Sequence, residues 1–325
     1  MTPLHFEQLH QAEWSELEAS LGRILKRGEH AKGPIPEGER VASLYRRACE
    51  HLALARSRSY PTHLLDQLEH LTADAHQVIY QRREFGLRRL AHLVTVDFPR
   101  AVRAHAAYVW ISTAVFGIPL IATGLLIFAK PDLILSVTSP EQAAAFEQMY
   151  SKHAESIGRT RTADTDWAMF GYYIRNNIGI SFQCFAGGLF AGLGSLFFLA
   201  YNGASIGGVA GYLTERGLAS TFFSFVATHS AFELTAIVLS GAAGLRIGHA
   251  LIAPGRRGRR QSLVVATKES AVILYGVVAM LLLAAAIEAF WSSAQWLPPI
   301  VKYSVAAVAW AAVLSYLLLQ GRHAD

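Results

Sequence analysis

The chain has 325 residues, of which 52% are hydrophobic and only 16% are charged, and its formal net charge is +5. Between residues 178 and 253 only Glu215, Arg216, Glu233 and Arg246 are charged. A water-soluble protein spreads its charges over every surface element, whereas apolar runs of about 20 residues match the hydrocarbon thickness of a bilayer. The composition excludes an ordinary soluble protein. It predicts an all-α, polytopic helical membrane protein with an N-terminal cytoplasmic helical bundle.

Residues 1–107 are predicted to form the cytoplasmic helical domain. Apolar residues recur there at spacings of three and four, in stretches separated by the Gly/Pro-rich residues 33–38 and by Pro61. Residues 1–30 contain no apolar signal stretch, so we expect the N-terminus to stay in the cytoplasm. A basic extension interrupted at Phe98-Pro99 then leads into the first apolar run.

Residues 108–325 are predicted to form the transmembrane domain, with 129–177 as an extracytoplasmic segment. Thr214–Gly217 interrupts one of the apolar stretches, which favours a broken or re-entrant helix there, sheltered by protein or water. The predicted spans are about 108–128, 178–200, 204–227 (broken or re-entrant), 229–251, 271–290 and 300–319.

The basic residues gather beside the apolar runs, which is the pattern of cytoplasmic loops in membrane proteins. They are Arg82, Arg83, Arg88, Arg89, Arg100, Arg103, Arg256, Arg257, Arg259 and Arg260. The positive charge is thereby explained without a nucleic-acid partner, and none is predicted. With the 254–260 loop inside, the chain must cross an even number of times, as six crossings or as four plus a re-entrant hairpin. We therefore expect a multi-pass protein of the bacterial cytoplasmic (inner) membrane with both termini cytoplasmic.

The segment from Phe222 to Leu245 carries a histidine and a glutamate, His229 and Glu233, in otherwise apolar chain. Their i, i+4 spacing places both side chains on one face of a helix. Ionisable groups at membrane depth cost a few kcal/mol each and usually face protein or water. The pair is the strongest functional candidate in the sequence.

Three roles are open for this pair. It can be a buried polar lock near the start of a helix, where the helix dipole favours the Glu233 anion. It can line a transport or lipid-handling path beside the broken helix. It can act as general base and orienting acid for a serine, for which Ser224, Ser230 and Ser240 are candidates without a nucleophile motif.

No metal or cofactor is predicted. A zinc site needs at least three protein ligands, and His249 lies about 30 Å further along a straight helix. Cys49 and Cys184 are too few for a disulfide framework or a four-thiolate site.

Other polar residues complete the predicted membrane core. Two asparagines at the outer start of the 178–200 stretch are interpreted as helix caps. Glu288 is expected only to reach the membrane interface. The predicted polar core comprises Asn176, Asn177, Asn202, His229, Glu233 and Arg246.

Two stripes of small residues repeat at i, i+4 and allow helices to approach closely in lipid. We expect these stripes to pack on each other or on the glycines of the 178–200 stretch, and they also permit a homodimer. The predicted packing residues are Gly203, Gly207, Gly211, Ser240, Gly244 and Gly248.

Several segments in a fixed order resemble the stage II sporulation protein M family of integral membrane proteins. The usual family pattern has glycine after the histidine, where this chain has Ser230. The segments are Arg175-Asn-Asn-Ile178, a glycine-rich span, Tyr201-Asn-Gly203 with Ile206-Gly207, His229-Ser-Ala-Phe-Glu233 and Ser240-Gly-Ala-Ala-Gly-Leu-Arg246. The helical front with Phe98-Pro-Arg100 is similar to that of longer bacterial members.

The resemblance implies an all-helical membrane fold and no established reaction. The founding member is implicated in peptidoglycan remodelling during sporulation, where it acts with cell-wall hydrolases as a membrane partner. His229 and Glu233 correspond to the family's signature polar pair, which has no assigned role.

Together these observations favour an integral membrane assembly or scaffold protein in an envelope or peptidoglycan-remodelling complex. Its expected partners are the lipid bilayer and membrane or cytoplasmic proteins. The alternatives are a transporter or lipid translocator that uses the broken region 201–235, and an intramembrane hydrolase that uses His229 and Glu233.

Overall fold

The computed structural model describes residues 2–25, 38–80, 87–151, 163–294 and 296–322, and within these residues it contains helices and no strands. The all-helical fold predicted from the sequence is therefore confirmed. The chain divides into two compact units, Met1–Gly86 (unit 1) and Leu87–Asp325 (unit 2). The sequence had suggested a boundary near residue 107. The division lies earlier because residues that follow Leu87 pack against the later helices of unit 2.

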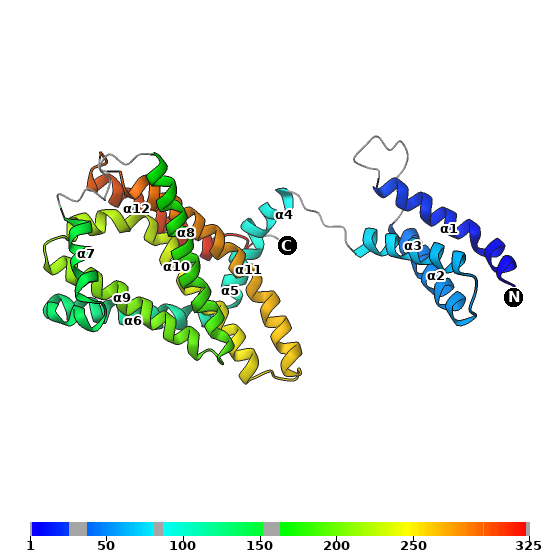
Figure 1. Cartoon of the computed structure of the whole chain (residues 1–325), viewed down its shortest axis with the longest axis horizontal. Coiled ribbons are helices and arrows are strands. Elements are labelled where there is room, and N and C mark those ends of the chain that lie inside the picture. Colours follow the sequence, from blue (N-terminus) through cyan, green and yellow to red (C-terminus); the bar gives the residue numbers. More distant parts are fainter. Residues whose placement is uncertain (1, 26–37, 81–86, 152–162, 295, 323–325) are drawn as a thin grey trace. The chain divides into compact units, whose positions relative to one another are not determined.

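Unit 1 consists of three helices, α1 (Pro3–Leu25), α2 (Gly38–Ser57) and α3 (Thr62–Tyr80) (Figure 1). Each described helix of unit 1 buries one apolar stripe, and the three stripes meet in a single core around Phe6, Trp14 and Leu68. The predicted break at residues 33–38 lies almost wholly outside the described residues. Pro61 immediately precedes α3, where its missing N–H is no loss to the helix.

Unit 2 begins with short helical turns and continues with long helices. Its helices are α4 (Leu87–His92), the π-helix η2 (Leu93–Asp97), α5 (Phe98–Ala104), α6 (Ala106–Ala129), the 3₁₀ turn η3 (Pro131–Ser136), α7 (Pro140–Tyr150), α8 (Ala163–Ala186), the 3₁₀ turn η4 (Gly187–Leu189), α9 (Leu193–Glu215), α10 (Ala219–Ile252), α11 (Arg259–Ala286), the π-helix η5 (Ile287–Ser292) and α12 (Pro299–Leu319).

Among the described residues, five helical segments are long and apolar enough to cross a membrane: α6, α9, α10, α11 with η5, and α12. Helix α8 is more polar, but it runs between the same two ends of unit 2. Near its start Trp167 contacts Phe290 of η5, and near its end the carbonyl oxygen of Cys184 lies against Gly244 of α10. With α8 included, six of the described helices run between these two ends.

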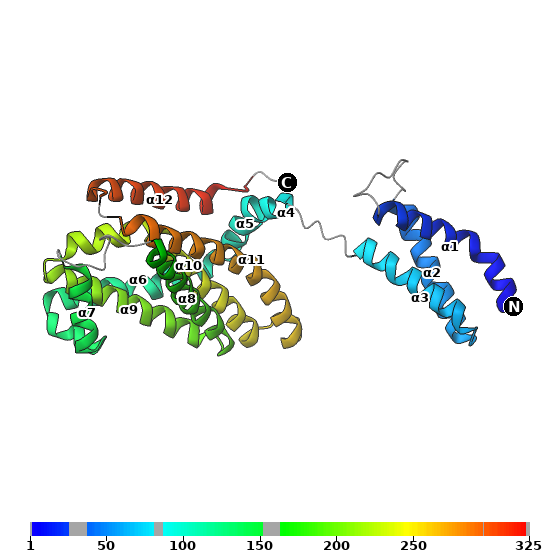
Figure 2. The same ribbon diagram turned by 45° about the horizontal axis from the view of Figure 1, so that its top comes forward.

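The two ends of this path lie together. Arg100 and Arg103 of α5 donate hydrogen bonds to the carbonyl oxygens of Gly321 and Leu317, at 2.9 and 2.8 Å. The start of unit 2 and the end of α12 therefore share one side of the unit, as Figures 1 and 2 show. This arrangement fits an even number of traversing helices.

Several predicted span limits differ from the helices that the structure contains. The stretch 178–200 is not one helix, because α8 ends at Ala186 and the chain reverses at Ala191 and Gly192, which both have positive φ. Gly192 adopts this left-handed conformation without a Cβ penalty. The stretch 204–227 is likewise divided between α9 and α10, with the break at Arg216–Leu218, close to the predicted interruption.

Helix α10 is longer than its predicted span at 229–251, because it begins at Ala219. The predicted spans at 108–128 and 300–319 nearly coincide with α6 and α12. The span at 271–290 lies within α11 and η5. The segment 129–177, predicted as extracytoplasmic, contains η3, α7 and the first part of α8.

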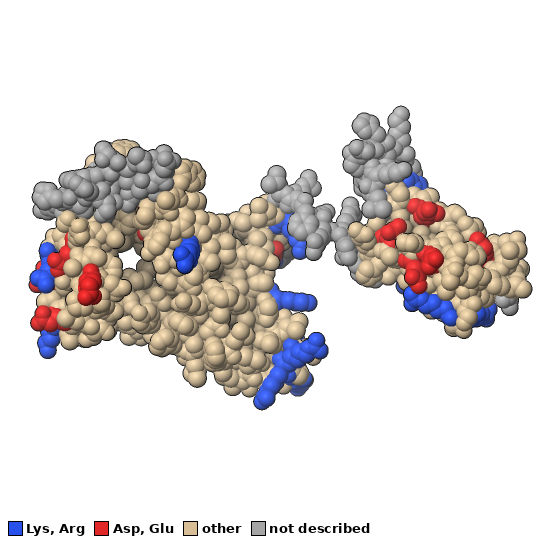
Figure 3. All heavy atoms as spheres, in the orientation of Figure 1, with Lys and Arg blue, Asp and Glu red and all other residues tan. Residues whose placement is uncertain are grey.

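Charged side chains are distributed differently over the two units. In the view of Figure 3 they are scattered over unit 1, whereas in unit 2 they gather at two ends. Apart from one basic group, the band between these ends is uncharged in this view. Large apolar side chains such as Trp110, Ile118, Leu125 and Val308 are exposed on the long helices of unit 2. This surface suits hydrocarbon rather than water.

Candidate functional site: a buried polar cluster in the membrane unit

His229 and Glu233 lie within α10, more than two turns from its first residue, Ala219. They are therefore not at a helix N-terminus, and the capping part of the polar-lock interpretation does not apply. The side chains share one face, with His229 Nε2 at 3.9 Å from Glu233 Oε2. Only 6% of the His229 side chain and 16% of the Glu233 side chain are exposed. The pair is sheltered inside unit 2.

The π-helix η5 brings two further polar residues to this pair. Ser292 Oγ lies 3.1 Å from His229 Nδ1. One oxygen of Glu288 lies within 4.8 Å of ligand atoms of both His229 and Glu233. Single π-helical turns inside α-helices are frequent at functional sites. Here the π turn places Glu288 and Ser292 one turn apart on the side that faces α10.

Helix α12 closes the cluster with a buried lysine. Lys302 Nζ donates a hydrogen bond of 2.7 Å to the carbonyl oxygen of Ser292. Thr228 Oγ1, next to His229 in α10, donates to the carbonyl oxygen of Lys302 at 3.3 Å. These bonds join α10, η5 and α12. A buried ammonium group is tolerated only where it is hydrogen-bonded or paired, and this one is.

Tyr150, the last residue of α7, belongs to the same electrostatic neighbourhood. Burial raises the pKa of its phenol, and the carboxyl groups of Glu288 and Glu233 raise it further. Its ring also makes edge-to-face contacts with Phe222 and Phe225 of α10. Phe225 in turn packs edge-on against the His229 imidazole. The cluster thus lies toward the α7 end of unit 2.

The other predicted polar residues are not part of this cluster. Asn176 and Asn177 lie inside α8 rather than at its start, so they are not caps, and Asn176 donates to Asn177 Oδ1 at 3.0 Å. Asn202, inside α9, donates to the carbonyl oxygen of Phe198 one turn earlier. Arg246 pairs with Glu269 of α11 at 2.8 Å, toward the opposite end of α10.

The small residues lie where helix backbones meet. A Cβ added to Gly203, Gly207 or Gly211 of α9 would overlap a carbonyl oxygen of α6. On α10, Gly244 and Gly248 lie against the α8–α9 turn, and Ser240 is fully buried. The two stripes therefore contact different neighbours. That of α10 meets the region of the predicted 178–200 stretch, whereas that of α9 meets the first span.

The sequence did not reveal the roles of Glu288, Ser292 and Lys302. Glu288 was interpreted as an interface residue, but it is only 9% exposed. A usable signal existed, because Glu288 and Lys302 are the ionisable residues of two apolar stretches in the same half of the chain as His229. What the sequence lacked was the π turn, which decides the face on which Glu288 lies.

Chemically, the cluster combines an imidazole, two carboxyl groups, an ammonium group and a hydroxyl. The histidine and the two glutamates could hold a cation, with Glu288 as the third ligand that the sequence had not supplied. The hydroxyl of Ser292 within reach of His229 resembles a nucleophile beside a base. The same bonds also fasten three helices to one another.

Two cavities lined by described residues lie elsewhere in unit 2. One of about 410 Å³ is lined by residues that include Tyr108, Arg246 and His249. The other, of about 390 Å³, is lined by residues of α8 that include Arg175 and Asn176. Neither lining includes a member of the His229 cluster.

Helices, apolar surface and an internal polar cluster define a multi-pass integral membrane protein. The family model of Stage II sporulation protein M matches residues 105–293, more than half of the chain, and this protein belongs to that family. A second family model, a domain of unknown function (DUF8413), matches residues 4–81 of unit 1. No curated protein and no solved structure matches the chain. The first match includes His229, Glu233, Glu288 and Ser292 and ends before Lys302.

Proposed function

We propose that this chain is a membrane-embedded assembly protein of a complex that acts on the bacterial cell envelope. Unit 2 anchors it in the cytoplasmic membrane, and unit 1 presents a charged helical surface to protein partners. The proposal is supported by family membership and by a separately packed, water-compatible unit that precedes the membrane unit in the chain.

The proposal depends on the hydrogen bonds that the polar groups of the cluster make with one another. His229 bonds to Ser292, Lys302 to the Ser292 carbonyl and Thr228 to the Lys302 carbonyl, so α10, η5 and α12 are cross-linked by their own polar groups. Such internal bonds stabilise one arrangement of helices at membrane depth. A rigid helical body is the requirement for a scaffold.

This role predicts a specific effect for Lys302. Lys302→Met leaves the buried Ser292 carbonyl without its donor, which should lower the free energy of unfolding by about 2 kcal/mol. Lys268→Met is the matched control, since Lys268 is exposed on α11. Thermal unfolding of the purified proteins in detergent measures the difference. Equal stability of the two variants would contradict a polar lock.

The assembly role itself is tested by photo-crosslinking in cells. A crosslinking amino acid at exposed positions of unit 1, such as Arg46 and Asp66, should capture the same envelope protein. The control position is Val308, which is exposed on the apolar surface of α12 and should capture mainly lipid. If neither unit 1 position captures an envelope protein at native expression, the assembly proposal fails.

A second candidate function, an intramembrane hydrolase, is favoured by one specific observation. Ser292 Oγ, His229 and Glu233 form a chain in which the imidazole lies between a hydroxyl and a carboxyl group. This is the order of a nucleophile, a base and an orienting acid. However, only 2% of Ser292 is exposed.

A serine-reactive fluorophosphonate probe distinguishes the hydrolase proposal from the scaffold proposal. Labelling of the wild type that disappears in Ser292→Ala and in His229→Gln, with Ser240→Ala unaffected, would establish the hydrolase and displace the assembly proposal. Absence of labelling in the folded wild type is the result that the scaffold role predicts.

A further inference from the structure

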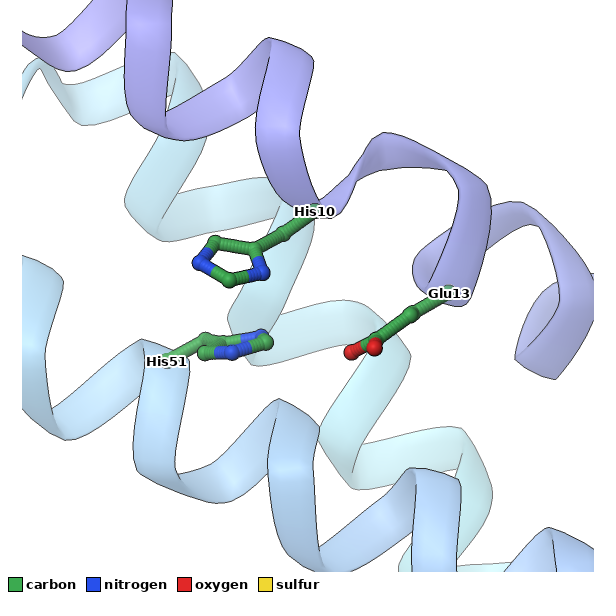
Figure 4. A group of neighbouring side chains, drawn as sticks. All are labelled: His10, Glu13 and His51. Atoms are coloured by element: carbon green, nitrogen blue, oxygen red, sulfur yellow. The ribbon is translucent and has the colours of Figure 1, made fainter.

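A second group of metal-binding side chains lies in unit 1, remote in sequence from the membrane cluster. It consists of His10 and Glu13 on α1 and His51 on α2. One ligand atom from each residue lies within 4.8 Å of the others. Figure 4 shows the two imidazole rings one above the other, with the Glu13 carboxylate beside them. We infer that these three side chains form a binding site for a first-row divalent transition metal of the zinc class.

The ligand types select this class of metal. Two imidazole nitrogens and one carboxylate oxygen are the donor set of many three-ligand zinc sites, in which water takes the fourth position. Calcium and magnesium require oxygen ligands, so they do not suit two histidines. The i, i+3 spacing of His10 and Glu13 places both on one face of α1. The third ligand comes from the neighbouring helix.

The imidazole rings of His10 and His51 are stacked on each other. Their centroids are 3.9 Å apart with an interplanar angle of 32°. Two protonated imidazoles at this distance would repel each other, so the pair favours neutral rings. A metal ion lies in the plane of each imidazole that binds it, so one ring must rotate out of the stack for both nitrogens to reach the same ion. A metal ion would turn this close approach into a bond between α1 and α2.

The surroundings resemble the outer shell of a metal site. Phe6 is fully buried and makes edge-on contacts with the rings of His10 and His51, at 4.9 and 5.7 Å. An apolar wall of this kind limits solvent access to the ligands. Arg47 pairs with Oε1 of Glu13, which fixes the carboxylate and leaves its other oxygen to coordinate.

Trp14 is the group with which the metal must compete. Its indole N–H donates a hydrogen bond of 3.1 Å to Nδ1 of His51. A metal at Nδ1 displaces this donor, and a metal at Nε2 requires the ring proton to move to Nδ1, which also breaks the bond. In either geometry, removal of the indole N–H should strengthen metal binding. This consequence distinguishes the site from a simple cluster of histidines.

The experiment is a zinc titration of the full-length protein, purified in detergent through a tag that contains no histidine. The wild type should take up one zinc ion in unit 1, and binding should weaken at least about 10-fold in His10→Ala and in His51→Ala. His63→Ala is the matched control, because His63 is an exposed histidine of the same unit on α3. Its affinity should equal that of the wild type.

Two further variants sharpen the test. Trp14→Phe should bind zinc about fivefold more tightly, which corresponds to the loss of one competing hydrogen bond. Glu288→Gln alters the membrane cluster and should leave the unit 1 site unchanged. Zinc uptake that is lost in Glu288→Gln but kept in His10→Ala would overturn the inference, because the ion would then lie in the membrane cluster.

A second measurement, the unfolding temperature, checks that each variant is folded. Zinc should raise the unfolding temperature of wild-type and His63→Ala proteins, because a ligand that binds only the native state stabilises it by mass action. At the same zinc concentration, the zinc-induced rise should be smaller in His10→Ala. Identical zinc-induced shifts in wild type and His10→Ala would also overturn the proposed site.

Discussion

Units 1 and 2 are both helical and both bury large apolar side chains, but unit 2 adds close glycine contacts and buried ionisable groups to its core. Unit 1 buries large side chains, among them Phe6, Trp14 and Leu68, and its charged residues lie on its surface. In unit 2, glycines let the backbone of α9 approach α6 and the backbone of α10 approach the α8–α9 turn, while ionisable groups such as Lys302 are inside. Both units are built from α-helices, but unit 1 is suited to water and unit 2 to lipid.

The difference follows from what each solvent favours. In water, burial of apolar surface stabilises a fold by about 25 cal/mol per Å², so large apolar side chains form the core. Lipid tails are as apolar as leucine, so this driving force is lost inside a bilayer. There, helices associate through close backbone packing and internal polar bonds. The predictions below test whether each unit depends on its own kind of core.

The largest effect is expected for Gly207→Leu in unit 2. A Cβ at Gly207 would overlap the carbonyl oxygen of Leu120 in α6, and the rest of a leucine has no space. The α6–α9 pair would have to separate, at a cost above about 3 kcal/mol. We expect little folded protein after membrane extraction, as measured by size-exclusion chromatography and thermal unfolding.

Gly117→Leu is the matched control for this substitution. Gly117 lies in α6 of the same helix pair, and a Cβ there would have no neighbour within 4 Å. Its yield and unfolding temperature should match those of the wild type. If both variants were equally unstable, glycine content rather than close packing would explain the effect, and the contrast with unit 1 would fail.

The glycine stripes show how much of the fold could be predicted from the sequence. Apolar periodicity and length were enough for the helical class and for the approximate positions of α6 and α12. Spacing also identified the residues of the close contacts. It did not identify the partner of Gly207, because the i, i+4 repeat describes one helix and carries no information about its neighbour.

The break at Gly192 was missed for a related reason. Residues 178–200 are mostly apolar and carry no charge, and hydropathy does not distinguish a straight helix from two helices joined by a tight turn. Four glycines of that stretch make close contacts with neighbouring backbone, and three of them, Gly187, Gly188 and Gly192, also form the reversal. A left-handed residue is a backbone property that composition alone does not fix.

In the candidate site, too, one part could be predicted from the sequence and another part could not. The i, i+4 spacing of His229 and Glu233 predicted a shared face, since that depends only on helix geometry. Ser292 and Lys302 join them through long-range contacts that depend on the π turn at η5 and on the position of α12. Such contacts are properties of the tertiary structure and are not encoded in local spacing.

In unit 1 the corresponding test is Leu68→Ala. Leu68 is fully buried in the three-helix core, so truncation leaves a cavity and should lower the free energy of unfolding by about 3 kcal/mol. Leu9→Ala is the control, because Leu9 is 55% exposed on α1. Hydrogen exchange should accelerate in α1–α3 of the Leu68 variant only. Equal acceleration throughout α6–α12 would show that the two units do not unfold separately.

The smallest effect is expected for Glu16→Gln, which removes an ion pair from the surface of unit 1. Arg40 binds both carboxylate oxygens of Glu16, at 2.8 and 2.6 Å, and this hydrogen bonding lowers the pKa of Glu16. Both side chains are nevertheless exposed, so water and salt screen the pair. Near pH 7 we expect the denaturation midpoint of Glu16→Gln to lie close to that of the wild type.

The pH dependence of this small difference has a fixed sign. Because the folded pKa of Glu16 lies below 4.5, the pair stabilises unit 1 above that pH and loses its effect as the pH falls further. Denaturation midpoints of wild type and variant should therefore converge on acidification, and added salt near pH 7 should have the same effect. A large loss of stability in Glu16→Gln that salt does not reduce would mean that a water-exposed ion pair stabilises the protein as much as the buried Lys302. The contrast between a surface where charges are hydrated and an interior where they must be bonded would then be wrong.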